Sequence, residues 1–225
     1  MTRRLRRIFL LSPARIGGIR GRLLVRPGAS FALASELRAR GLPLADIFTF
    51  ASGLYFRGKI TYARRFADPA TDVVRVITAT AGLLEPERVL TVADLRRHGE
   101  IDIDESEPRF TRPLRRDASR LAACLQPGGQ AILLGSIATA KYRETLLGVF
   151  GPQLVFPQDF VGRGDMSRGG LLLRAARDGV ELPYIPVAGA VVKGTRPARL
   201  EPLLPFPRTS ATASTRVRKA RRRDV

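Results

Sequence analysis

Two glycine-rich segments of the chain carry residues that could bind an anion. Residues 12–22 follow a short apolar run and contain three glycines, one serine and three arginines, and residues 162–170 contain four glycines, two arginines, one serine and one aspartate. Glycine lets backbone N–H groups approach a phosphate, and arginine offers a planar fork of donors that matches phosphate oxygens. We therefore expect a site for phosphate or nucleic acid made of Ser12, Arg15, Gly17, Gly18, Arg20, Arg163, Gly164, Ser167 and Arg168.

Neither segment matches a known nucleotide-binding fingerprint. No lysine followed by serine or threonine closes residues 12–22, which excludes a P-loop, and the glycine spacing differs from that of the dinucleotide-binding motif. A flexible surface turn explains this segment equally well. In residues 162–170 the glycines could simply turn the chain while Asp165 caps a helix, whose free N–H groups would otherwise favour an anion.

A carboxylate and several tyrosines allow a catalytic interpretation of the same region. Asp165 is a candidate acid, base or oxocarbenium partner in an enzyme that acts on nucleotides or nucleobases, such as a glycosidase or a transferase. Tyr142 could stack on a base, and Tyr55, Tyr62 and Lys141 could line the same cleft. A tyrosine at a strand end also commonly packs as a half-buried residue, so both interpretations stay open.

An acidic run could hold a hard cation. Residues 100–107 contain five carboxylates, and in an extended chain Glu100, Asp102 and Asp104 would share a face that could bind Mg²⁺ or Ca²⁺, as in a metal-dependent nuclease. The alternative, which we favour, is a solvated loop that pairs with the arginines just downstream, without a cofactor. The single histidine, His98, is expected to be an exposed loop residue, and with one cysteine in the chain a Cys/His zinc site is excluded.

The net charge of +19 is concentrated at the two ends of the chain. Residues 1–30 hold eight arginines and no acidic residue, and residues 203–225 hold seven basic residues and one acidic residue. Such blocks bind phosphate backbones without reading sequence, so the expected partner is nucleic acid, DNA or RNA. Because only four of the 39 basic residues are lysine, a GC-rich genome could also explain the arginine excess. Neither basic end shows an apolar helix face, so a membrane is not an expected partner.

Short apolar runs alternate with helix-like segments, which is typical of a sheet fed by crossover helices. Strands are expected at residues 8–11, 47–51, 73–79, 131–134 and 153–156. Helices are expected at residues 31–40, 113–125, 138–150 and 167–177, the first with Ser30 as its N-cap and Gly41 at its C-terminus. The expected fold is a three-layer α/β fold with a mostly parallel sheet and flanking helices.

Length and composition indicate one domain with a basic tail. The expected α/β domain spans residues 1–202, and residues 203–225, where proline, serine, threonine and arginine replace the apolar pattern, are expected to be a disordered tail. No apolar run approaches the ~20 residues of a membrane-spanning helix, no secretory signal is visible, and one cysteine permits no internal disulfide. These features predict a cytoplasmic protein.

Four short motifs resemble the YaaA peroxide-stress family. Residues 11–15 resemble its Ser-Pro-Ala-Lys opening, residues 80–86 its Tyr-Gly-x-Leu-Arg-Pro stretch, residues 136–142 its Ser-x-Glu-Tyr, and residues 164–168 its Gly-x-Met-Ser-Arg. Arg15 and Ala81 stand where that family has lysine and tyrosine. The resemblance implies an α/β core with a positively charged cleft, DNA binding and a role in protecting DNA under oxidative stress.

Together these observations predict a nucleic-acid-binding α/β protein whose loops at the strand ends hold a phosphate or a nucleotide. The alternatives left open are an enzyme acting on nucleotides or nucleobases, a metal-dependent nuclease, and a module that binds a protein partner of unknown identity.

Overall fold

A six-stranded mixed sheet forms the centre of the molecule, as the computed structural model shows for residues 4–192 and 194–200. The strands are β1 (Leu5–Leu11), β3 (Asp72–Ile77), β4 (Leu83–Leu84), β6 (Leu125–Leu134), β7 (Leu154–Pro157) and β8 (Tyr184–Pro186). Their order in the sheet is β4-β3-β1-β6-β7-β8. The four central strands run parallel to one another, and the two outer strands, β4 and β8, are antiparallel to their neighbours. The continuous apolar runs at Ile8–Leu11 and Ala131–Leu134 are buried because helices cover both faces of the sheet.

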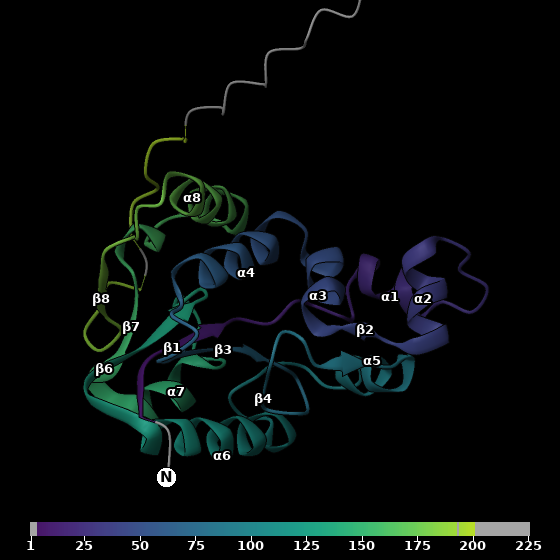
Figure 1. The fold of residues 1–225 in the computed structure, drawn as a ribbon, viewed down its shortest axis with the longest axis horizontal. Coiled ribbons are helices and arrows are strands. Elements are labelled where there is room, and N and C mark those ends of the chain that lie inside the picture. Colours follow the sequence, from purple (N-terminus) through teal and green to yellow (C-terminus); the bar gives the residue numbers. More distant parts are fainter. Residues whose placement is uncertain (1–3, 193, 201–225) are drawn as a thin grey trace, which may run out of the picture.

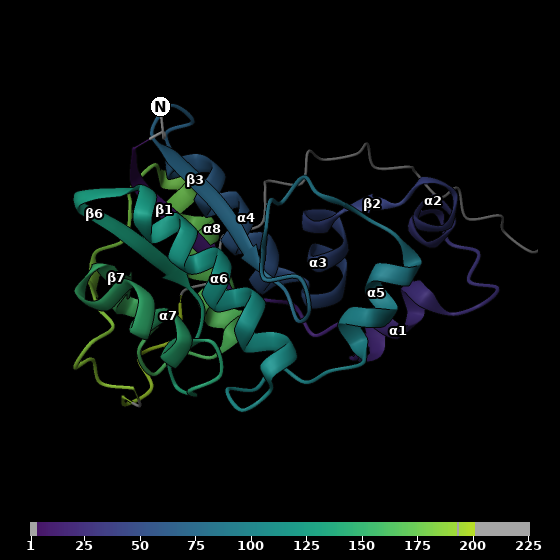
Figure 2. The same cartoon turned by 90° about the horizontal axis from the view of Figure 1, so that it is seen from below.

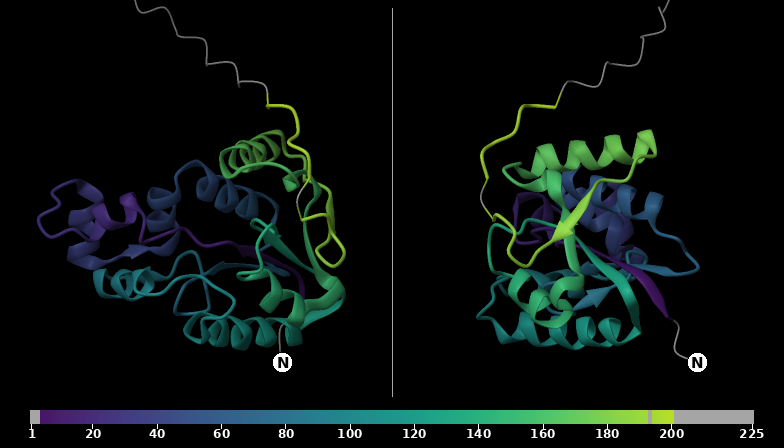
Figure 3. Two further views of the ribbon diagram at one scale, coloured as in Figure 1. Left: turned by 180° about the vertical axis from the view of Figure 1, so that it is seen from behind. Right: turned by 90° about the vertical axis from the view of Figure 1, so that its left-hand side faces the viewer.

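Two pairs of helices make the outer layers. α4 (Leu54–Phe66) and α8 (Asp165–Asp178) lie together on one face, and α6 (Pro108–Cys124) and α7 (Arg143–Phe150) lie on the other (Figure 1). The right-hand view of Figure 3 shows α8, in light green at the top, and α6, in teal at the bottom, on opposite sides of the sheet. This confirms the three-layer α/β fold with a mostly parallel sheet.

A group of short helices, called here the helical lobe, lies beyond the carboxyl ends of β1 and β3 (Figure 2). It contains α1 (Ile19–Val25), α2 (Ala32–Arg40), α3 (Leu44–Ser52) and α5 (Val92–Gly99), with a small antiparallel pair of strands, β2 (Leu42–Pro43) and β5 (Val89–Leu90). Two 3₁₀ turns, Gly151–Gln153 and Gln158–Phe160, flank β7. The lobe therefore faces the sheet edge where parallel α/β folds bind ligands.

Several local predictions were wrong. The expected strand at residues 47–51 belongs to α3, because a short apolar run fits a buried helix as well as a strand. The helix expected from Ala138 begins at Arg143, and the residues before it form a loop. At the start of α2 the N-cap is Phe31 and, among the described residues, no side chain caps it, whereas Gly41 ends the helix as predicted.

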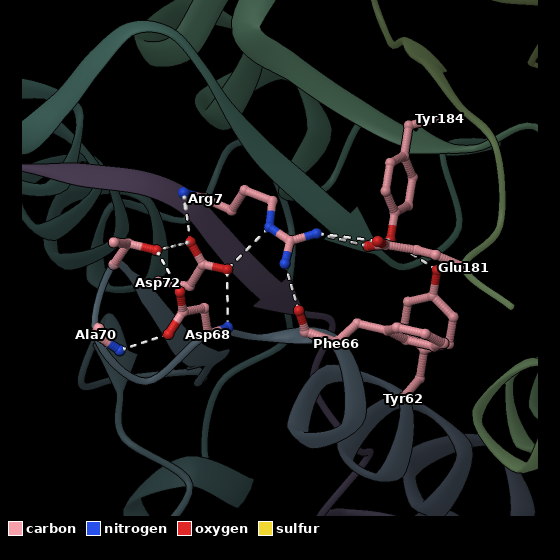
Figure 4. Close-up of polar contacts among 9 residues, drawn as sticks. Arg7, Tyr62, Phe66, Asp68, Ala70, Asp72, Glu181 and Tyr184 are labelled. Atoms are coloured by element: carbon pink, nitrogen blue, oxygen red, sulfur yellow. Dashed lines mark hydrogen bonds and ion pairs between the residues drawn. The ribbon is translucent and has the colours of Figure 1, made fainter. Parts of the chain in front are cut away.

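Polar contacts tie the first half of β1 to its neighbours. Figure 4 shows the Arg7 guanidinium between two carboxylates, with Nε 2.8 Å from Asp72 Oδ2 and Nη1 2.8 Å from Glu181 Oε1. Arg7 also donates to the carbonyl of Phe66, and the Tyr184 hydroxyl donates to Glu181 over 2.7 Å. Asp72 is buried, so this arginine neutralises a charge inside the fold. One of the eight N-terminal arginines is thus structural.

Within residues 4–192 and 194–200, no helix combines the length and the apolar character needed to cross a membrane. The expected tail at residues 203–225 lies outside the described residues.

Candidate functional site

A pocket of about 950 Å³ opens at the carboxyl ends of the parallel strands. Ser12 follows β1, Ala79 follows β3 and Ser136 follows β6, and all three line it. The helical lobe and the loop after α5 close the opposite wall, and Asp165 at the start of α8 completes it. The volume is within the range of pockets that hold small ligands and cofactors.

The pocket wall carries three kinds of chemistry. Positive charge comes from Arg15 and Lys141, and negative charge comes from Asp102, Asp104 and Asp165. Hydroxyl groups and aromatic rings fill much of the remainder, contributed by Ser12, Ser52, Ser136, Thr139, Phe48, Tyr55 and Tyr142. A polar molecule with both an anionic part and groups that donate hydrogen bonds fits this lining.

A buried lysine lies behind Ser12. The side chain of Lys59, from the middle of α4, has 0% exposure, and its Nζ is 2.6 Å from the carbonyl oxygen of Ser12 and 2.8 Å from Ser12 Oγ. Nζ also lies 4.3 Å from the centre of the Tyr55 ring and 5.0 Å from that of Phe56. Desolvation by this burial lowers the pKa of Lys59 to about 7, against a smaller opposing effect of Asp165.

Tyr142 lies on the other side of Ser12. Its hydroxyl donates to the carbonyl oxygen of Ser136 over 3.0 Å. Gly135 lets these groups come together, because a Cβ atom there would lie 2.8 Å from Ser12 Cβ and 2.9 Å from Tyr142 Oη. Burial raises the pKa of Tyr142 to about 12, and its contact with Ser12 has a smaller, lowering effect. The phenol is therefore a neutral donor at neutral pH.

The hydroxyl of Tyr55 is the least satisfied polar group near the pocket. It is buried and has no hydrogen-bond partner among the described residues. Burial raises the pKa of this phenol, and the nearby Arg168 guanidinium has a smaller opposite effect. The Tyr55 oxygen is sealed from solvent, so it does not face a ligand in this structure.

Asp165 and Arg168 form a pair at the start of α8. The N-cap of α8 is Gly164, so Asp165 occupies the first helical position; its side chain is 68% exposed, and the residue lines the pocket. Arg168 is buried, with Nε 3.2 Å from the carbonyl oxygen of Phe160 and Nη1 3.3 Å from Asp165 Oδ1. The arginine thus holds the carboxylate at the pocket and is itself used by the fold.

The structure brings together some of the predicted site residues and places the others elsewhere. Ser12, Arg15, Gly17, Tyr142 and Asp165 line the pocket. Six predicted residues do not belong to the lining that the described residues form, namely Gly18, Arg20, Arg163, Gly164, Ser167 and Arg168.

The residues outside the lining have contacts of their own. Gly18 is the N-cap of α1, and the guanidinium of Arg20 lies against Gly53, where it would be 2.8 Å from an added Cβ. Arg163 donates to the carbonyl oxygen of Asp159 over 3.0 Å and to Ser167 Oγ over 3.2 Å. These groups hold the two glycine-rich segments in shape next to the pocket.

The acidic run and the histidine also have defined places. Asp102 and Asp104 line the pocket, whereas Glu107 is the N-cap of α6 and pairs with Arg109. In residues 4–192 and 194–200 no three His, Cys, Asp or Glu side chains gather as a metal site would need. The prediction for His98 was wrong: it belongs to α5, is buried and lines the pocket, and a hydrogen bond of 2.6 Å between its Nδ1 and Thr80 Oγ1 satisfies the buried ring.

The tyrosine set was partly misplaced, and one residue was missed. Tyr55, Tyr142 and Lys141 do line one pocket, but Tyr62 is buried elsewhere, 2.7 Å from the hydroxyl of Tyr184. Lys59 was not considered, although a signal exists: it is one of four lysines in the chain and falls among the buried positions 55, 56, 60 and 63 of α4. A lysine on the apolar face of a helix is rare without a function or a partner.

Comparison of the chain with models of known protein families, with curated proteins and with solved structures finds no match.

Proposed function

We propose that this protein binds nucleic acid and accommodates one of its nucleotides in the pocket at the strand ends. The observation that supports this most is the composition of the lining, in which cations, carboxylates and aromatic rings surround a single cavity of about 950 Å³. A nucleotide has an anionic phosphate, a sugar or base edge that donates hydrogen bonds, and an aromatic base.

The phosphate would bind on the side of Arg15 and Lys141. Arg15 belongs to the glycine-rich segment after β1, and Lys141 to the loop before α7. Both residues line the pocket and come from loops at the ends of different strands. Two cations approaching one phosphate from two sides give charge-assisted hydrogen bonds of the stronger kind.

The sugar and base would meet the carboxylates and the rings. Asp102 and Asp104 can accept hydrogen bonds from sugar hydroxyls or from exocyclic amino groups. Phe48, Tyr55 and Tyr142 offer apolar surface to the base. The basic chain ends, meaning the arginines of residues 1–30 other than Arg7 and Arg15 and the seven basic residues in 203–225, would add contacts to the backbone that do not depend on sequence.

Binding of labelled single-stranded and duplex oligonucleotides, followed by fluorescence anisotropy against salt concentration, tests this proposal. We expect the logarithm of the affinity to fall linearly with the logarithm of the salt concentration, and deletion of residues 203–225 to reduce that slope by several units. A flat salt response, or no binding at low ionic strength, would contradict the proposal.

A double variant tests the place of binding. Arg15→Ala combined with Lys141→Ala should weaken binding by about tenfold or more, since two charge-assisted contacts are lost. Arg112→Ala combined with Arg115→Ala, which removes two exposed charges on α6, is the matched control and should change affinity by less than about threefold. Equal losses in both variants would show that the pocket has no special role. DNA protection under stress is the cellular role that such binding would serve.

A further inference from the structure

We propose that Ser12 is a nucleophile and that Lys59 is the base that takes its proton, so that the pocket supports acyl transfer or hydrolysis of a carboxylic ester or activated acyl group. This inference goes beyond nucleotide binding. It rests on the Ser12 hydroxyl at the pocket wall and on a fully buried amine 2.8 Å behind it. Serine paired with lysine is a known variant of the serine–histidine arrangement.

The position of Ser12 is fixed from both sides. Its backbone N–H donates to the carbonyl oxygen of Leu134 over 3.1 Å, which continues the pairing of β1 with β6, and Pro13 follows it directly. Its own carbonyl oxygen accepts from Lys59 over 2.6 Å. The hydroxyl is thus held at the end of a buried strand, as catalytic groups in α/β folds commonly are.

Lys59 can act as a base because its surroundings disfavour the ammonium form. Burial lowers its pKa to about 7. The charged groups that face it are on α8, where Asp165 raises this pKa and Arg168 lowers it. The phenols nearby, Tyr55 on the same helix and Tyr142 beyond Ser12, have raised pKa values and remain neutral. A neutral amine can donate one N–H to the Ser12 carbonyl and accept the Ser12 hydroxyl proton.

The reaction can be written with all atoms accounted for. The Ser12 Oγ–carbon bond forms at the substrate carbonyl while the hydroxyl proton passes to Lys59 Nζ. The bond to the leaving oxygen or sulfur then breaks, and that atom takes the proton from Lys59. Water then gives a proton to Lys59 Nζ as its oxygen attacks the acyl carbon. The bond between this carbon and Ser12 Oγ breaks, Oγ takes the proton back from Lys59, and the carboxylic acid leaves. Charge on the carbonyl oxygen would be met by the guanidinium of Arg15, which lines the same pocket.

A lysine with only a structural role would make one of the same contacts. The contact with the Ser12 carbonyl could by itself hold the end of β1 and the middle of α4 together. That role requires no reactivity at Oγ, so reactivity separates the two explanations.

Labelling of the full-length protein with an alkyl fluorophosphonate provides the test. The Ser12 oxygen would displace fluoride from phosphorus, with its proton passing to Lys59, and the adduct would be seen by intact mass and located by peptide mapping. We expect one adduct on Ser12, none in Ser12→Ala, and a labelling rate in Lys59→Met reduced by about 100-fold or more. Ser119→Ala, which changes an exposed serine on α6, is the control and should label like the unmodified protein.

The labelling rate of the unmodified protein should rise with pH through the titration of Lys59 and level off above it. Absence of an adduct, an adduct at the same rate in Ser12→Ala, or an unchanged rate in folded Lys59→Met would overturn the inference. If Lys59→Met does not fold, a labelling rate that is flat between pH 5 and 9 overturns it instead. Oligonucleotide binding by Ser12→Ala is measured in parallel, so that failure of this inference and failure of the proposed binding are told apart.

Discussion

Gly58 of α4 and Gly169 of α8 face each other with no room for a side chain between them. A Cβ atom on Gly58 would lie 2.6 Å from the carbonyl oxygen of Gly169, and one on Gly169 would lie 2.8 Å from the carbonyl oxygen of Leu54. The two helices therefore touch through their backbones. This close packing brings Lys59, next to Gly58, near the start of α8, where Asp165 and Arg168 influence its charge.

Replacement of Gly58 by alanine should destabilise the protein by about 1–3 kcal/mol, because the added methyl group has no space and the helices must separate. Gly148→Ala in α7 is the matched control, since its Cβ would meet no described atom within 4 Å, and removal of a helical glycine should raise stability by up to about 1 kcal/mol. Urea denaturation of both variants measures the difference. Similar stabilities for the two would show that α4 and α8 are not tightly packed.

The central strands could be predicted because they contain continuous apolar runs, as in Ile8–Leu11 and Ala131–Leu134, which are typical of a sheet covered on both faces. Residues 47–51 were wrongly predicted to be a strand, because so short an apolar run does not distinguish the two-residue period of a strand from the 3.6-residue period of a helix. Their helical state follows from α3 packing against α4 and α1, which is a tertiary contact.

The place of the candidate pocket could be predicted from the sequence, but only part of its lining could. In a parallel sheet the loops that follow the strands lie at the same end of the sheet. This brings together four predicted residues, which are Ser12, Arg15, Tyr142 and Asp165. Arg168 was expected to meet an anion, but it lies one turn after Asp165 and beside the Phe160 carbonyl, and these two acceptors occupy it. The partnership of Lys59 with Ser12 joins residues 47 positions apart and depends on how α4 lies on β1, which no local pattern encodes.

The burial of Lys59 should make stability depend on pH. The pKa of this amine is about 7 in the folded protein and near the ordinary lysine value of 10.5 when unfolded. Between these values the unfolded chain binds the proton and the folded protein does not, so this contribution to stability rises with pH by up to about 1.4 kcal/mol per unit. Below pH 7 both states bind the proton, so the folded protein carries the full free-energy cost of burying a charged amine.

Chemical denaturation of the unmodified protein and of Lys59→Met between pH 6 and 9 measures this contribution as a difference. The stability of the unmodified protein relative to the variant should increase steadily above pH 7. This range stays below pH 10, where the raised pKa values of the buried tyrosines would lower stability. A difference that does not change with pH would mean that Lys59 is charged and compensated in the folded state.

Loss of Arg7 should be costly, because the buried carboxylate of Asp72 would lose its contact with the Arg7 guanidinium. Arg7→Met is expected to lower the unfolding free energy by about 2–4 kcal/mol, somewhat less than for an isolated buried pair since backbone N–H groups of Arg7 and Asp68 still bind that carboxylate. Arg177→Met, which breaks an exposed pair with Asp178, should cost less than about 1 kcal/mol. Equal effects would place the Arg7 network among ordinary surface ion pairs.

Asp165 and Arg168 offer a test of the pocket electrostatics in two opposite directions. Asp165 raises the pKa of Lys59 and Arg168 lowers it. The midpoint of the fluorophosphonate labelling profile should therefore move to lower pH in Asp165→Asn and to higher pH in Arg168→Met. Asp165→Asn should keep its stability because the side chain is mostly exposed, whereas Arg168→Met should lose about 1–3 kcal/mol because the Phe160 carbonyl is left without its donor. Midpoints that shift together, or not at all, would show that the titrating group is not the amine behind Ser12.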